Sequence, residues 1–418
     1  MRFSFIVGIL VLSVFNLKAQ SPEKVLNGSS KTYDQFFEMD AAYEIGGGSV
    51  NNAMLNRFLF GGFIDEATKT SNSDRLNKLN YAGQSARLRL SYRQENRKIF
   101  NREFLGYQIN LEWNNMAQIR FTPDLFQTIF YGNSAFTGDF ASLSQTSFYY
   151  LNYYSIGGGL NGYFNSKKHF FLVNIQLNLG NSYQKLNLSD AHLFTSEQAD
   201  SLSFEGIINY DYLKTDQYNF GQIHGYGAGI DFLYRYENQK NTLLEFRLDD
   251  FGFIYWPKKM RTLDYDKPII WEGMEVSNIL QMPDSLFSTN FNDTVNDFLS
   301  QNSSVGPKTI FTNFSIQARY RRNLMPKKLD IEAVVNYWFT GYLYGEHQVK
   351  LHYTVSPSFS ITPSIGYGRY SRFNFGLGFK FQQKNGNAVS IGTNYLSGII
   401  LQQKFAGLGG FINFTKQI

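Results

Sequence analysis

The chain has 418 residues and no cysteine, which excludes disulfide frameworks and cysteine metal sites. Its net charge is only +5 and no basic cluster occurs, so we expect no nucleic-acid partner. Aromatic residues reach 17%, charged residues are held to 17%, and glycine is frequent at 36 residues, a composition typical of transmembrane β-barrels.

The first twenty residues, MRFSFIVGILVLSVFNLKAQ, resemble an export signal. Arg2 supplies a positive charge, Phe5 to Phe15 an apolar stretch, and Ala19 a small residue before a cleavage site. We therefore expect a removed signal peptide over residues 1–19 and a periplasmic segment over residues 20–34. No later run of about eighteen apolar residues occurs, so helical membrane spans are not expected.

From residue 35 onward, apolar and polar side chains alternate with a period of two. In residues 173–179, the odd positions are Val, Ile, Leu and Leu, whereas the even positions are Asn, Gln and Asn. In an outer membrane, the apolar face of such a strand would meet lipid and the polar face would line a lumen. We expect these side chains to face lipid: Val173, Ile175, Leu111, Phe375 and Phe379.

The same alternation predicts about fourteen strands. They are expected near residues 35–46, 80–94, 103–115, 146–165, 169–183, 219–237, 241–255, 308–322, 328–341, 345–356, 358–370, 372–383, 386–398 and 402–417. Each is about as long as a tilted strand needs to cross a bilayer.

The connections between these strands alternate in length. Every second one is short and polar, whereas four of the others are long, over residues 47–79, 116–145, 184–218 and 256–307. Short periplasmic turns and long external loops are typical of bacterial barrels. The prediction is therefore an all-β protein, a closed antiparallel transmembrane β-barrel over residues 35–418, located in the outer membrane.

Two soluble folds would also show alternating strands. A β-sandwich usually has shorter strands and lacks the long and short rhythm of connections. A β-propeller would show an internal repeat of about forty residues, and none is found. The barrel is the interpretation that these patterns favour.

Charges of both signs occupy the inward positions of three hairpins. The predicted lumen network comprises Arg87, Arg89, Glu112, Asp231, Arg247, Glu245, Arg319, Asp330 and Glu332. Counting back from the turns gives three opposed sets: Asp231 with Arg247, Arg87 with Glu112, and Arg319 with Asp330 or Glu332. Such a network could form a charged transport path or a salt-bridge lattice that fills the lumen. Because the signs are mixed, the lattice is favoured.

Residues 47–66, GGSVNNAMLNRFLFGGFIDE, are too apolar for an ordinary exposed loop. Apolar side chains at helical spacing make this segment a candidate plug, ligand contact or partner-docking helix: Met54, Leu55, Phe58, Leu59, Phe60 and Phe63. A loop helix packed on its neighbours is an equally good interpretation.

Catalysis finds little support in the sequence. Of five histidines, only His352 is clearly inward on a strand, and no metalloprotease helix, phosphate-binding glycine loop or metal-ligand set occurs. We therefore predict a protein that is not an enzyme and that has no cofactor and no metal site.

The signal ending in Ala-Gln, the segment GGSVNNAMLNRFLFGGFID and the Tyr- and Asn-rich strands together resemble outer-membrane barrels of Bacteroidota. The chain is similar to a family of unknown function there, distantly related to FadL-type transporters and to the PorV and PorP/SprF-like barrels of type IX secretion and gliding. This resemblance implies fourteen strands and a surface location, and it supplies no ligand or catalytic residue.

Two functions follow as hypotheses. The first is a non-enzymatic scaffold in a surface or secretion assembly, with outer-membrane lipid and lipopolysaccharide around it and a protein partner at its external loops. The second is a FadL-like channel that takes up a hydrophobic small molecule. Balanced lumen charge and the long loops favour the scaffold, whereas the apolar cluster from Met54 to Phe63 favours the channel.

Overall fold

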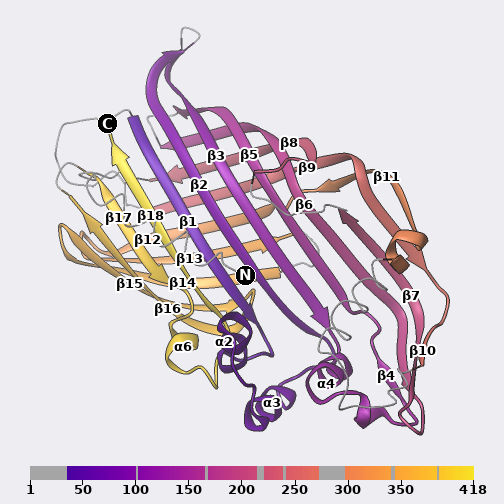
Figure 1. Ribbon diagram of the computed structural model, residues 1–418. Coiled ribbons are helices and arrows are strands. Elements are labelled where there is room, and N and C mark those ends of the chain that lie inside the picture. The colour runs from indigo at the N-terminus through magenta and orange to yellow at the C-terminus, as the bar shows by residue number, and fades with distance from the viewer. Residues whose placement is uncertain are drawn as a thin grey trace.

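The computed structural model describes residues 35–99, 102–164, 168–213, 221–238, 242–272, 297–339, 344–383 and 386–418. The expected signal peptide and the segment over residues 20–34 lie outside these described residues. Figure 1 shows strands arranged in a ring, with a small group of helices at one end.

Fourteen of the described strands form the ring. They are β1 (Gln35–Gly47), β2 (Asn80–Ile99), β3 (Arg102–Phe121), β5 (Ser147–Phe164), β6 (His169–Thr195), β8 (Gly225–Glu237), β9 (Thr242–Tyr265), β12 (Ser315–Met325), β13 (Leu329–Trp338), β14 (Tyr344–Ser356), β15 (Phe359–Gly368), β16 (Ser371–Gln382), β17 (Ala388–Thr393) and β18 (Leu408–Gln417). Each pairs antiparallel with the next in this order, and β18 pairs with β1. The closed antiparallel ring confirms the predicted all-β barrel.

The long connections over residues 184–218 and 256–307 contain strands that the sequence did not indicate. Beyond the ring, β6 continues and pairs with β7 (Ser201–Leu213). β9 also continues, and it pairs with β7 on one side and with β11 (Ser303–Phe311) on the other. Short strands β4 (Phe140–Ser142) and β10 (Ile269–Glu272) add to this sheet. We call β4, β7, β10 and β11, together with the outer halves of β6 and β9, the sheet extension.

One predicted strand, over residues 308–322, is wrong because it merges two strands. β11 pairs with the outer half of β9, whereas β12 pairs with the inner half, so the two share one long partner. Alternation of apolar and polar residues does not reveal where one strand ends and the next begins when both pair with the same neighbouring strand. The predicted strand over residues 386–398 likewise ends at Thr393 and is followed by a helix.

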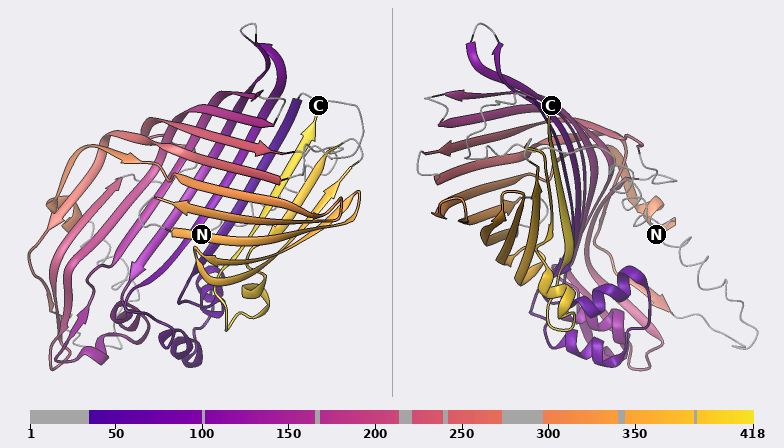
Figure 2. Two further views of the ribbon diagram at one scale, coloured as in Figure 1. Left: turned by 180° about the vertical axis from the view of Figure 1, so that it is seen from behind. Right: turned by 90° about the vertical axis from the view of Figure 1, so that its left-hand side faces the viewer.

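Helices gather at the ring end that carries the long connections. They are α2 (Asn52–Phe60), α3 (Glu66–Ser73), α4 (Pro123–Tyr131), the 3₁₀ turn η1 (Asn133–Phe136) and α6 (Leu396–Ile400). Asn51, Asp65 and Thr122 begin α2, α3 and α4, each accepting a hydrogen bond from the backbone N–H three residues later. Figures 1 and 2 place α2, α3, α4 and α6, the rim helices, at the end opposite the C-terminus.

The outer face of the ring is apolar and the inner face is largely polar. Ile175 is 70% exposed, whereas Asn174 beside it is 1% exposed. Leu111 and Phe375 are also exposed, and Val173 and Phe379 are half-buried on the same face. A water-soluble protein would place these side chains the other way round.

Apolar layers also occupy the lumen, which the alternation did not predict. Toward the long connections, Trp256 and Tyr153 are buried in a cluster with Met116, Leu151 and Tyr183. Gly180 and Gly225 leave room for the indole, since a Cβ at either position would lie less than 3 Å from its ring. Toward the short turns, a smaller cluster comprises Phe170, Leu172 and Leu233.

Candidate functional site

The middle of the lumen holds a cluster of buried charges centred on Arg89 of β2. Its Nε donates to Glu112 of β3, and its terminal nitrogens lie 3.5 Å from Asp231 Oδ2 and 3.4 Å from Asp249 Oδ1. Arg87 Nε lies 2.6 Å from the other oxygen of Glu112. We call Arg87, Arg89, Glu112, Asp231 and Asp249 the buried lattice.

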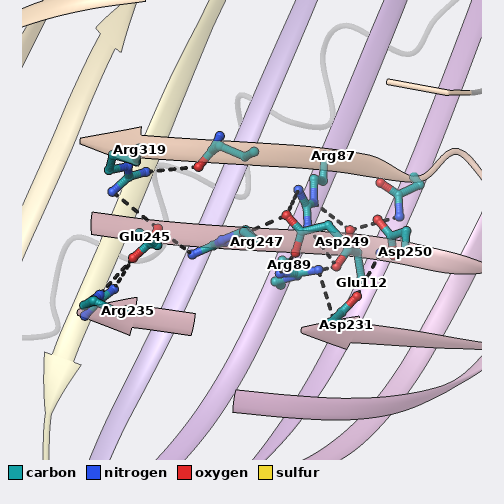
Figure 3. Close-up of polar contacts among 12 residues, drawn as sticks. Arg87, Arg89, Glu112, Asp231, Arg235, Glu245, Arg247, Asp249, Asp250 and Arg319 are labelled. Atoms are coloured by element: carbon teal, nitrogen blue, oxygen red, sulfur yellow. Dashed lines mark hydrogen bonds and ion pairs between the residues drawn. The ribbon is translucent and has the colours of Figure 1, made fainter. Parts of the chain in front are cut away.

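The buried lattice joins parts of the ring that are not neighbours. β2 and β3 are separated from β8 and β9 by β5 and β6 in the order of the ring. Figure 3 shows the strands that carry Asp231 and Asp249 crossing the strands that carry Arg89 and Glu112, with the charged groups between them. The ion pairs therefore tie two walls together across the lumen.

A second cluster surrounds Glu245 of β9. Arg235 Nη2 lies 2.7 Å from its Oε2, while Arg247 and Arg319 each place a nitrogen 3.8 Å from its Oε1. Arg319 also reaches Glu332 of β13, with 3.9 Å between Nε and Oε1. We call Arg235, Glu245, Arg247, Arg319 and Glu332 the second lattice.

The predicted pair of Asp231 with Arg247 is wrong. Leu233 is the residue opposite Arg247, and Asp231 instead contacts Arg89 and accepts a hydrogen bond from the backbone N–H of Asp250. From Glu237 opposite Leu243 to Leu233 opposite Arg247 the register is regular, so the prediction placed the centre of the turn one residue too early. The register shift, between Ile230 and Phe232, and the positive φ of Asp250, 60°, lie beyond this pair.

The other two expected sets are found in the structure, and of the two acidic residues expected near Arg319, Glu332 is its partner. Arg87 contacts Glu112, and Arg319 contacts Glu332. Asp330 instead accepts a hydrogen bond from Asn323 at 2.6 Å, across the hairpin of β12 and β13.

Several charged lumen residues were absent from the sequence prediction. Asp250 is buried although the plain alternation of β9 would turn it outward, because the irregularity at this residue reverses the faces. Arg369 pairs with Glu44 at 2.9 Å, and its guanidinium lies 3.9 Å from the ring centroid of Trp338. The alternation of the strands could not indicate Arg369, because this residue lies in a turn between two strands.

His352 lies between two polar neighbours. Its Nδ1 is 3.1 Å from Thr362 Oγ1 and its Nε2 is 3.4 Å from Glu332 Oε2. The order of groups resembles a hydrolytic triad, but Glu332 is already engaged by Arg319, and the two cavities described below contain none of the three residues. In the part of the chain that the structure describes, no His, Cys, Asp and Glu side chains are grouped to hold a metal ion.

The apolar segment over residues 47–66 forms α2 and the turn that follows it. Met54 and Leu55 are buried and pack with Phe121 and Phe126. Partly buried members of the same cluster include Ala82 and Ile119, which belong to the outward-facing positions of β2 and β3. The segment therefore packs as a loop helix against the outer side of the ring's rim.

The aromatic residues of this segment are mostly exposed. Phe60 and Phe63 are exposed, Phe58 is exposed at the edge of the cluster with its ring centroid 5.6 Å from that of Phe130, and Leu59 is half-buried. A groove of about 810 Å³ lies between α2 and the chain after α6. We call it the rim groove, and its lining includes Ala53, Asn56, Arg57, Phe60, Asp65, Ile400, Leu401, Gln402 and Lys404. A second cavity, of about 360 Å³, lies beside Glu245 and Arg319.

Comparison with known proteins identifies a family. The model of the family of unknown function DUF5723 matches residues 42–390. No protein of curated function matches the sequence. Within the described residues, no helix is long and apolar enough to cross a membrane.

Three solved structures have a similar arrangement of the chain. They are a TodX monoaromatic hydrocarbon channel mutant (TM-score 0.47, 9% identity, covering 93% of this chain and 91% of that one), the Pseudomonas putida toluene transporter TodX (0.43, 8%, 93% and 90%) and a Pseudomonas aeruginosa FadL homologue (0.38, 8%, 91% and 89%).

Proposed function

Because the chain belongs to DUF5723, a family of unknown function, we propose its role from its own geometry. The protein is a non-enzymatic outer-membrane β-barrel that acts as a scaffold. Its lumen is closed, and the sheet extension holds a protein partner in a surface or secretion assembly. The sequence resemblance implies an assembly of the type IX secretion or gliding class.

The outer surface supports a location within a membrane. Exposed apolar side chains cover the ring, and aromatic groups cluster near both ends of its strands. At the short-turn end, Phe164 stacks on His169 with centroids 4.8 Å apart, and at the other end Tyr226 lies 5.7 Å from Tyr255. Two aromatic girdles beside an apolar band are the pattern of transmembrane barrels.

The filled lumen is the observation that carries the scaffold proposal. The buried lattice crosses the lumen, and apolar clusters lie toward both of its ends. Glu112, Asp231 and Asp249 are less than 10% exposed, so little water reaches them. A conducting pore would need a continuous wet path past these groups.

The sheet extension supports the partner-binding role. β6 has 27 residues and β9 has 24, whereas a tilted strand crosses a bilayer with about 9–11. The surplus projects beyond the membrane as part of the sheet extension, whose short strands β4 and β10 carry exposed Phe140, Ile270 and Trp271. Exposed aromatic residues on a rigid sheet are suited to protein recognition.

Two measurements on the purified chain test this function. In planar bilayers, we expect no stable conductance from the wild-type protein, and a pull-down from detergent extract should recover a stoichiometric protein partner. Trp271→Ser should release that partner, whereas Phe164→Ser at the opposite end should retain it. Porin-like conductance, or a pull-down without a partner, contradicts the scaffold.

A second candidate function is uptake of a hydrophobic small molecule. Phe60, which lines the rim groove, and the exposed Phe58 and Phe63 of the same segment favour it. Mass spectrometry of co-purifying small molecules tests this candidate. A bound fatty acid or similar solute that is lost on Phe58→Asp would replace the scaffold with a transporter.

A further inference from the structure

The rim groove combines an apolar wall with basic side chains. Phe60 is 77% exposed and Ile400 is 67% exposed, and they lie on the two sides of the groove, on α2 and α6. Arg57 and Lys404 are also exposed in its lining. Within the described residues, no ion pair is found for either of these two cations.

The single acidic group in the groove is already engaged. Asp65 caps α3, and its Oδ1 accepts a hydrogen bond from the backbone N–H of Thr68 at 2.7 Å. Hydrogen bonds from Thr68, together with the neighbouring charge of Arg57, lower the pKa of Asp65. Because the lining holds one carboxylate and two cations, Arg57 and Lys404, it has a net positive charge that suits an anionic ligand.

The two helices that border the groove, α2 and α6, are anchored to the ring beside its apolar outer surface. α2 packs over the outward-facing Ala82 and Ile119, as described above. Ser397 of α6 accepts a hydrogen bond at 3.3 Å from the backbone N–H of Phe375, whose exposed side chain faces outward on β16. Figures 1 and 2 show α2 and α6 beside each other at this end of the ring.

We propose that the rim groove binds an anionic membrane lipid, with its phosphate at Arg57 and Lys404 and its acyl chains along Phe60 and Ile400. This assignment rests on the proposed position of the ring in a membrane. The charge of the lining selects a phosphate, and the anchoring of α2 and α6 beside the outer surface places the groove within reach of acyl chains on the apolar side of the ring.

Native mass spectrometry of the full chain in detergent micelles tests the proposal. Phosphatidylglycerol and phosphatidylcholine with the same acyl chains are added separately, and the lipid retained per protein is measured. Since a basic residue near an anionic lipid surface contributes about 1 kcal/mol, Arg57→Gln with Lys404→Gln should weaken phosphatidylglycerol retention about tenfold or more. Retention of phosphatidylcholine should fall much less, because its choline cation offsets the charge of its phosphate.

A matched control removes the same charge elsewhere. Lys327→Gln with Lys328→Gln, in the exposed turn between β12 and β13, should leave phosphatidylglycerol retention as in the wild type. Phe60→Ser should weaken retention of both lipids, because it removes apolar contact and not charge. Heat-modifiable migration on gels shows that each variant is folded.

Three results would overturn the lipid site. They are equal phosphatidylglycerol retention by the wild type and the double variant, an equal loss in the control, and a second protein chain bound in place of lipid. A chain without heat-modifiable migration would instead contradict the membrane barrel itself, so the failure of the two proposals can be distinguished.

Discussion

The two charge lattices in the lumen use the same residue types in different surroundings. In the buried lattice, the side chains of Arg89, Asp231 and Asp249 are at most 10% exposed and that of Glu112 is fully covered, whereas Arg87 is 33% exposed. In the second lattice, about a third of Arg235 and Arg319 is exposed around the covered Glu245. Water reaches the cations of the second lattice, whereas Arg89 and its three carboxylates are closed to it.

The exposure of each lattice to water, rather than its number of ion pairs, should therefore decide how much it contributes to the free energy of unfolding. Removing one partner from a buried set leaves charges that are desolvated and unpaired, which is costly. Removing one from a hydrated set loses a weak, screened interaction. Three variants test this comparison.

The largest effect is expected for Arg89→Gln. The change leaves Glu112, Asp231 and Asp249 without their shared cation, so the free energy of unfolding should fall by about 3–5 kcal/mol. Urea titration in detergent, followed by heat-modifiable migration, measures the loss. Arg89→Lys keeps the charge and should lose less, and an equal loss in both variants would show that charge is not the cause.

A smaller effect is expected for Arg319→Gln. Its contacts to Glu245 and Glu332 are 3.8 and 3.9 Å long, and Arg235 and Arg247 remain near Glu245. The same titration should show a loss of about 0–1 kcal/mol, which is further reduced by salt. A loss as large as that of Arg89→Gln would remove the distinction between the lattices.

The smallest effect concerns Asp65, a fully exposed charge at the start of α3. Hydrogen bonds from Thr68 lower the pKa of Asp65 in the folded state below its ordinary value of 3.8. The stabilisation is present above the unfolded pKa and is lost as the pH falls through the folded one. Amide exchange in α3 should therefore accelerate below pH 3.8, and Asp65→Ala should abolish this dependence. An unchanged pH dependence in the variant would assign it to another group.

The rim helix α2 shows what the sequence pattern could predict and what it could not. The spacing of Met54, Leu55 and Phe58 predicted a helix, and α2 spans Asn52–Phe60. The same pattern left open whether this helix would plug the lumen or pack outside it. Contacts with Phe121 and Ile119, from a strand some sixty residues away, decide its place. Helical spacing defines an apolar face, but not the surface that covers it.

The sequence by itself determined most strands of the ring and their two faces. Alternation is a property of neighbouring residues, because successive side chains of a strand point to opposite faces, so Ile175 and Asn174 could be assigned directly. The pair of Arg87 and Glu112 could also be expected, since the two residues lie across one hairpin.

Only the tertiary structure decided how the lumen is filled. Arg89 meets Asp231 and Asp249 because closure of the ring brings distant strands across from one another, and no local pattern encodes that crossing. The irregularity at Asp250 reverses the faces of β9 and brings Trp256 into the lumen, where Gly180 leaves it space. A shift of one residue exchanges the inner and outer faces of a strand, so the contents of the lumen depend on the register of the whole ring.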